Sequence, residues 1–286
     1  MRTILRVVVL LLSAPEICLA LQVSPPRASV LAACKSTIFG GLVACLLSAP
    51  AAAENYEWQL MNGNVVLKDP IVLSVAGSDK VSLVKPQLIG AGGGGAVFAF
   101  EDSQKLLKVS WEGSAKSVER ECSTLQLLEK NQVQASERCL GKYDYDKNRV
   151  MILAEPYVSD GVASVMEVDP SKRAFVVEQI ARTLVQMLAA NVITIDVQPL
   201  ISKETGQVIF IDMTEAQVLK PPFTFLAKTL MSSFTTEMMT LIPDEYMPKA
   251  AKATLQEIKN LEALGVTMSP EAMEVLEGQT SLFDPA

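Results

Sequence analysis

The chain has 286 residues, with 25 Lys and Arg side chains against 32 Asp and Glu, no His, and a formal net charge of −7. The absence of His excludes a zinc site built from Cys and His. Hydrophobic residues make up 49% of the chain, and many of them fall in the first fifty positions. That region has the pattern of targeting segments rather than of a folded domain.

Residues 1–20 have the form of a secretory signal peptide. Arg2 and Arg6 come first, an apolar run follows, and the segment ends in small residues. Residues 21–36 are short, basic and free of acidic side chains, as transit peptides are. The sequence therefore predicts two targeting segments in series.

A second apolar run at 37–47 precedes an alanine-rich stretch in which Ala51 and Ala53 supply a second A-x-A cleavage site. This pattern predicts a second signal over 37–53. The alternative is a retained membrane anchor, but 37–47 is too short to cross ~30 Å of hydrocarbon as a helix. We expect cleavage before Glu54.

Signal, transit segment and second signal together resemble the layered targeting presequence of an alga with a secondary plastid. The resemblance implies a mature protein in the plastid (chloroplast), in the thylakoid lumen if the last signal is used. Four basic residues and one acidic residue lie in 1–53, so the mature part has 21 basic and 31 acidic side chains and a net charge of −10. This charge argues against nucleic acid and anionic membrane surfaces as partners.

The first half of the mature chain is predicted to be an antiparallel sheet with one helix. Apolar residues recur at three or four positions over 115–128, which indicates an amphipathic helix. Alternating apolar and β-branched residues predict strands at 65–73, 81–84, 105–111, 138–145 and 150–154.

The second half is predicted to be mainly helical. Asp169 and Pro170 supply an N-cap and a first-turn proline for a long helix that stops at Asn191. Short strands are predicted on either side of a turn at 203–206, and three further helices follow. These elements occupy residues 192–195, 207–211, 225–241, 248–264 and 270–276.

Five glycines among the six residues 90–95 stand between two apolar runs. Gly90, Gly92, Gly95 and Val97 have the spacing G-x-G-x-x-G-x-V. Glycines allow positive φ and let backbone N–H groups approach an anion. A dinucleotide-binding fold needs a helix after the glycines, but the following residues are β-branched and aromatic. The pattern therefore favours the nucleotide-covering loop of a protein kinase, with a flexible hairpin turn as the alternative.

Over about residues 80–220, the order of these elements and motifs resembles the protein-kinase-like superfamily. The resemblance implies an α+β, bilobal protein-kinase-like fold. Residues 54–158 would form an antiparallel-sheet N-lobe with one helix, and 159–286 a reduced, mainly helical C-lobe.

The resemblance also assigns roles to single residues. Lys108 matches the strand lysine that contacts the nucleotide phosphates, and Glu121 matches the helix glutamate that pairs with it. Glu155 falls where the adenine-binding hinge begins. Asp196 matches the catalytic-loop aspartate, and Asp212 matches the aspartate of D-F-G that binds Mg²⁺. Taken alone, each is better explained as an ordinary strand or helix residue, but together and in order they predict a site for ATP and Mg²⁺.

The departures from the kinase pattern concern catalysis more than binding. Thr194 and Ile195 stand where the catalytic loop has His and Arg, and Gln198 replaces its lysine. No Asn follows to hold a second metal, the glycine of D-F-G is missing after Asp212, and no A-P-E is found. If this segment is aligned with the kinase pattern on Gly206 without a gap, Thr194 rather than an aspartate falls at the catalytic position.

Cys122 and Cys139 are the two cysteines of the mature part. They lie on the predicted helix and on the strand after it, which pack together in a kinase-like N-lobe. Two buried free thiols are the favoured interpretation. In an oxidising compartment they would form a disulfide that holds the helix of Glu121 in place.

We therefore expect an atypical kinase-like phosphotransferase that moves the ATP γ-phosphoryl group to a hydroxyl of a protein or small-molecule acceptor. Lys108 and Asp196 would be its catalytic residues. The alternative is a pseudokinase that works as an interaction or scaffold module in the plastid, and the damaged catalytic loop favours it. The expected location of the protein suggests a third function, that of a structural partner of thylakoid components.

Overall fold

Residues 54–77 and 80–280 are those that the structure, a computed structural model, describes. The three targeting segments predicted over 1–53 lie outside the described residues. No helix of the described part is long and apolar enough to span a membrane.

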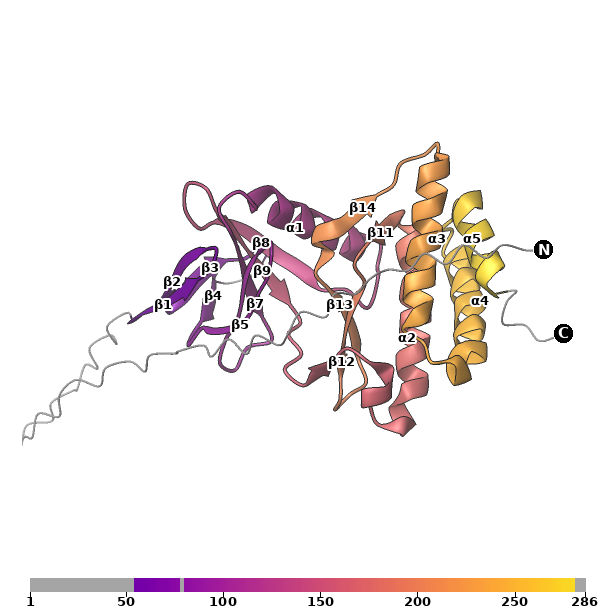
Figure 1. The fold of residues 1–286 in the computed structure, drawn as a ribbon, viewed down its shortest axis with the longest axis horizontal. Helices are drawn as coiled ribbons and strands as arrows, with labels where there is room; N and C mark the ends of the chain where they lie inside the picture. The colour runs from indigo at the N-terminus through magenta and orange to yellow at the C-terminus, as the bar shows by residue number, and fades with distance from the viewer. Residues whose placement is uncertain (1–53, 78–79, 281–286) are drawn as a thin grey trace, which may run out of the picture. The chain divides into compact units, whose positions relative to one another are not determined.

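A five-stranded antiparallel sheet organises the first half, in the order β5-β6-β7-β9-β8 (Figure 1). Its strands are β5 (Gln87–Ala91), β6 (Gly95–Ala99), β7 (Leu106–Ser110), β8 (Arg138–Asp144) and β9 (Val150–Glu155). The helix α1 (Ala115–Lys130) covers one face with its buried apolar stripe. The strands predicted at 105–111, 138–145 and 150–154 and the helix predicted at 115–128 are confirmed.

Two hairpins pack on the other face of this sheet. They are formed by β1 (Glu54–Leu60) with β2 (Gly63–Asp69) and by β3 (Ile71–Ser74) with β4 (Lys80–Leu83). The single strand predicted over 65–73 is wrong, because the chain breaks at Pro70, which has no N–H to donate to a ladder. Trp58 of β1 contacts Phe98 of the sheet with ring centroids 4.8 Å apart.

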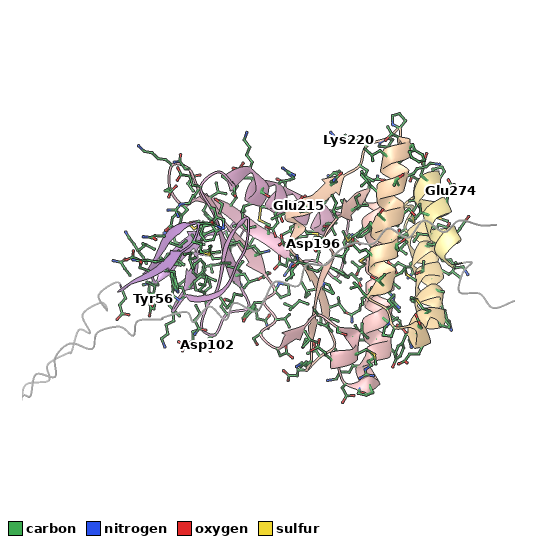
Figure 2. All side chains as sticks on the ribbon, viewed as in Figure 1. Tyr56, Asp102, Asp196, Glu215, Lys220 and Glu274 are labelled. Carbon is green, nitrogen blue, oxygen red and sulfur yellow. A yellow bond between two sulfur atoms is a disulfide. The ribbon has the colours of Figure 1, made fainter. Side chains whose placement is uncertain are left out.

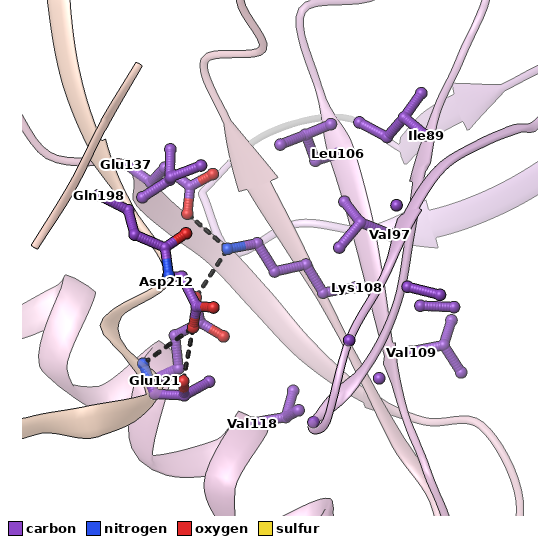
Figure 3. Close-up of a pocket in the computed structure, with 18 of the residues that line it drawn as sticks. Ile89, Val97, Leu106, Lys108, Val109, Val118, Glu121, Glu137, Gln198 and Asp212 are labelled. Carbon is purple, nitrogen blue, oxygen red and sulfur yellow. Dashed lines mark hydrogen bonds and ion pairs between the residues drawn. The ribbon is translucent and has the colours of Figure 1, made fainter. Parts of the chain in front are cut away.

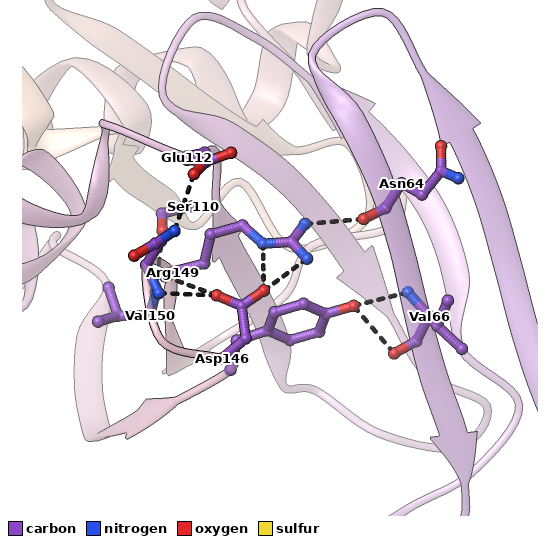
Figure 4. Close-up of polar contacts among 9 residues, drawn as sticks. Asn64, Val66, Ser110, Glu112, Asp146, Arg149 and Val150 are labelled. Carbon is purple, nitrogen blue, oxygen red and sulfur yellow. Dashed lines mark hydrogen bonds and ion pairs between the residues drawn. The ribbon is translucent and has the colours of Figure 1, made fainter.

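The turn between β8 and β9 ties the first hairpin to the sheet (Figure 4). The Tyr145 hydroxyl accepts a hydrogen bond from Val66 N–H at 2.7 Å and donates one to its carbonyl at 3.1 Å. The Arg149 guanidinium donates to the Asn64 carbonyl at 2.7 Å and pairs with Asp146 at 2.6 Å. The bonds from Tyr145 and Arg149 to the hairpin join residues 79 and 85 positions apart in sequence and fix the hairpin as part of the N-lobe.

The second half is built on four helices: α2 (Pro170–Ala189), α3 (Phe225–Thr240), α4 (Met247–Ala263) and α5 (Pro270–Thr280). Asp169 accepts a hydrogen bond from Ser171 N–H and caps α2 as predicted. The helix α2 packs against α4, and α3 packs against α5 (Figure 1). The four predicted helices are confirmed, with ends that differ by up to four residues.

Short strands join the two halves. A three-stranded sheet contains β10 (Gly161–Val162), β12 (Gln198–Ser202) and β13 (Val208–Ile211), and β11 (Val192–Thr194) pairs with β14 (Ala216–Val218). The turn at 203–206 therefore joins β12 to β13, and the strand predicted at 192–195 does not flank it. The predicted fold class, a bilobal α+β fold with one helix on the first sheet, is confirmed.

Candidate functional site

A cavity of about 380 Å³ lies between the glycine-rich hairpin of β5 and β6 and the residues that follow β13 (Figure 3). Most of the residues singled out from the sequence line it: Gly90, Gly92, Gly95, Val97, Lys108, Glu121 and Asp212. Glu155 and Asp196 are not among the lining residues. The fold thus brings together the predicted phosphate-binding and metal-binding groups, but not the predicted catalytic carboxylate.

The glycines of the hairpin act through lack of bulk rather than through unusual backbone angles. None of the five adopts a positive φ, so the tip does not use the left-handed conformation that glycine allows. A Cβ atom added at Gly95 would lie 2.2 Å from the Val109 carbonyl oxygen, whereas one at Gly93 would meet nothing within 4 Å. Gly95 is therefore required for the close approach of β6 to β7, and the other glycines keep the tip open above the cavity.

Trp111 holds the glycine-rich hairpin in place. Its backbone N–H donates to the Gly94 carbonyl at 3.1 Å, and its indole N–H donates to the Gly92 carbonyl at 2.6 Å. The side chain is buried. The sequence pattern marked Trp111 only as the end of a strand, so this role was not predicted.

Lys108 is positioned by the register of β7. Leu107 and Val109 face the hairpins, and Lys108 faces α1, opposite Val97 of β6 and Ile152 of β9. Its ammonium group lies 2.7 Å from the Glu121 carboxylate, so the pair implied by the kinase resemblance is present.

Glu137 is a second partner of Lys108 that the sequence analysis missed. Its carboxylate lies 2.6 Å from the ammonium group, and its side chain is 1% exposed (Figure 3). Its backbone N–H donates to the Phe210 carbonyl at 3.3 Å, and the Phe210 N–H donates to the Ala135 carbonyl at 2.8 Å. The loop before β8 is thereby fixed beside β13, which ends next to Asp212. Only this long-range pairing brings Glu137 to the site.

Burial and charge oppose each other at these groups. Burial alone would lower the pKa of Lys108, but Glu137 and Glu121 outweigh it and raise that pKa above the usual lysine range. Burial also raises the pKa of Glu137, against the opposing effect of Lys108. The carboxyl groups of Glu121, Glu137 and Asp212 line the same cavity as the one ammonium group of Lys108.

Asp212 follows β13 in the left-handed region, with φ 56°. Its carboxylate accepts hydrogen bonds from the Thr214 hydroxyl at 2.5 Å and the Thr214 N–H at 3.4 Å. These bonds from Thr214 fix the orientation of the aspartate. Carboxylates suit Mg²⁺, which is usually held by one or two of them together with substrate phosphates. Among the described residues no group of three or more His, Cys, Asp or Glu side chains is arranged to hold a metal ion.

Asp196 lies on the exposed segment between β11 and β12 (Figure 2). Its carboxylate accepts a hydrogen bond from the side chain of Gln198, which does line the cavity. Thr194, the other candidate for the catalytic position, is buried, and its hydroxyl donates to the Asp196 carbonyl at 3.0 Å. The carboxylate of Asp196 is therefore connected to the cavity through the side chain of Gln198.

Glu155 uses its carboxylate away from the cavity. It pairs with Arg138 at 2.5 Å and with Lys105 at 3.1 Å. The next two residues, Pro156 and Tyr157, line the cavity instead. Any contribution of the segment after β9 to the cavity therefore comes from its backbone and from the side chains of Pro156 and Tyr157.

Cys122 and Cys139 form a disulfide between α1 and β8, with their Cα atoms 5.2 Å apart. The favoured interpretation of two free thiols is wrong, and the alternative is confirmed. Cys122 directly follows Glu121, and Cys139 lies two residues after Glu137. The disulfide therefore joins the two backbone segments whose glutamates hold Lys108.

Similarity to known proteins is found at the level of structure and not at the level of sequence. No protein-family model matches the chain, and no curated protein matches it. Among solved structures 644 chains match. One match is WaaP in complex with acyl carrier protein, with 16% identity and a TM-score of 0.40, covering 70% of this chain and 90% of WaaP. That similarity is too low to assign a function.

Proposed function

We propose that this protein binds ATP with Mg²⁺ in the cavity under the glycine-rich hairpin and transfers the γ-phosphoryl group to a hydroxyl acceptor. One observation carries the proposal. A glycine-rich hairpin, a buried lysine–glutamate pair and a carboxylate from the other lobe line one cavity of about 380 Å³. The volume falls within the usual range for small-ligand sites.

Each part of the cavity suits one part of the nucleotide. The open hairpin tip would cover the phosphates, Lys108 would neutralise their charge, and Asp212 would hold the Mg²⁺ bound to them. The apolar walls, which include Ile89 and Leu200, suit a flat base. The bound Mg²⁺ would supply charge neutralisation at the phosphates.

The position of Asp196 favours a second candidate function, that of a pseudokinase. Its carboxylate is exposed and bonded to Gln198 rather than directed into the cavity. A protein with this arrangement would bind nucleotide and act through contacts with a partner. The targeting segments predicted from the sequence support the plastid as the place of either function, with thylakoid components among the candidate partners.

Binding is tested first, with the chain from Glu54 onward. A ligand present at a hundred times its Kd stabilises the folded state by about 2.7 kcal/mol, which raises the thermal midpoint measurably. We expect ATP to raise the midpoint only with Mg²⁺, and Asp212→Asn to abolish the rise. Asparagine tolerates the left-handed backbone of this position, so the variant changes charge and little else. Absence of any rise at millimolar ATP would refute nucleotide binding by the parent chain.

Turnover is tested separately, by release of ADP in the presence of candidate hydroxyl acceptors. We expect Asp196→Asn to keep the Mg²⁺-dependent thermal rise and to lose turnover. Binding by the parent chain without turnover on any acceptor would support the pseudokinase instead.

A further inference from the structure

The two carboxylates on Lys108 leave its ammonium group occupied on two sides. Glu121 takes one N–H donor at 2.7 Å and Glu137 takes another at 2.6 Å. A lysine ammonium group has three donors, and the Lys108 side chain is only 11% exposed. A phosphate oxygen that reaches this group at short range has to compete with a carboxylate already in contact with it.

Glu137 is the partner that the phosphate would have to displace. Pairing with Glu121 comes from the helix and is part of the kinase-like pattern, whereas Glu137 comes from the loop fixed to β13 and is additional to that pattern. Glu137 and Asp212 lie at the same end of β13, and both line the cavity. Glu137 therefore adds its negative charge where the metal-binding carboxylate already stands.

The charge balance makes this competition strong. The cavity contains one ammonium group, that of Lys108, against the carboxylates of Glu121, Glu137 and Asp212. A polyphosphate brings further negative charge into a poorly solvated space, where charges at contact distance interact more strongly than in water. Neutralising one carboxylate without changing its shape should therefore favour the phosphate.

We propose that Glu137 is a built-in competitor for the nucleotide phosphates at Lys108, and that nucleotide binding requires its carboxylate to leave the ammonium group. The inference rests on the proposed function, because it concerns the same cavity. It assigns opposite roles to two glutamates that contact the same nitrogen. Glu121 orients Lys108 for the phosphate, and Glu137 withholds Lys108 from it.

The test is a titration of ATP with Mg²⁺ into the parent chain, Glu137→Gln and Glu121→Gln, by isothermal calorimetry. We expect Glu137→Gln to lower the Kd by about tenfold or more and Glu121→Gln to raise it. Glu257→Gln is the matched control, because Glu257 is also buried and accepts a hydrogen bond from a glutamine side chain, Gln186, at 2.7 Å. Its Kd should equal that of the parent.

A second variant guards against loss of folding. Glu137→Asp keeps the charge but withdraws the carboxylate by one methylene, and its Kd should fall between those of the parent and Glu137→Gln. Thermal midpoints without ATP identify any variant that does not fold.

The outcomes separate this inference from the proposed function. Binding by the parent with an equal or higher Kd in Glu137→Gln overturns the competitor role and leaves the nucleotide site standing. Binding by Glu137→Gln alone supports the competitor role and makes the parent chain a self-inhibited binder. Binding by neither overturns both.

Discussion

Removing the Cys122–Cys139 disulfide should destabilise the protein by about 3 kcal/mol. The bond closes a loop with a sequence separation of 17 residues, and closing a loop of this size removes that much conformational freedom from the unfolded chain. For a domain of this length, the same loss should lower the thermal midpoint by about 6–12 °C. It is a large fraction of the stability of a typical domain.

The assay is denaturant unfolding of the chain from Glu54 onward, followed by tryptophan fluorescence with and without reductant. Cys122 and Cys139 are the only cysteines in this part of the sequence, so the reductant acts on one bond. The double variant Cys122→Ala/Cys139→Ala is the control, because its unfolding should not respond to reductant. Two free thiols by non-reducing mass spectrometry, or a reductant effect below about 1 kcal/mol, would contradict the reasoning, because the loop entropy predicts about three times as much.

The remaining predictions concern the residues around the cavity. Gly95→Ala should destabilise the fold by about 1–3 kcal/mol, because its Cβ would lie 2.2 Å from the Val109 carbonyl; Gly93→Ala, which meets nothing within 4 Å, should be near neutral in the same denaturation assay. Trp111→Phe leaves a loop carbonyl without its indole donor and should cost about 1–3 kcal/mol and raise the Kd for ATP with Mg²⁺; unchanged stability and Kd would exclude its role in holding the hairpin. Lys108→Met should destabilise by about 3–5 kcal/mol at neutral pH, because two buried carboxylates lose their counter-charge. The pKa of Lys108 is raised in the folded state, so its contribution to stability is complete below the ordinary lysine pKa and is lost as the pH rises toward the folded value. A stability profile at alkaline pH that is the same for the parent and Lys108→Met would contradict that assignment.

The sequence predicted the elements that depend on local pattern. The helix over 115–128 and the strands around Lys108 follow from apolar periodicity, which the packing in the structure preserves. The strand β12 was missed although it pairs with β13 across the predicted turn, because it contains Pro199, which argues against a strand in a sequence pattern. The strand β14 was missed because it has three residues and pairs with β11, more than twenty positions earlier. The hairpin β1–β2 depends in the same way on contacts such as that of Tyr145 with Val66.

The residues of the candidate site also divide into those that local pattern predicts and one that only long-range pairing brings to the site. Lys108, Glu121 and Asp212 stand at recognisable spacings within or directly after predicted elements, and the structure places all three at the cavity. Glu137 stands in a loop at no recognisable spacing, and only the pairing of that loop with Phe210 brings its carboxylate to Lys108. A buried glutamate beside a buried lysine leaves no signal in a single sequence, because nothing local distinguishes it from a solvated loop residue.

The contacts around Lys108 also bear on whether the site turns over. Glu137 is bonded through its backbone to β13, and β13 pairs with β12, in which Gln198 lies opposite Ile211. Gln198 in turn bonds the carboxylate of Asp196. Under the proposed function, nucleotide binding depends on Lys108 and turnover on Asp196, which contacts Gln198 rather than Lys108, so a variant at Glu137 that improves binding need not improve turnover.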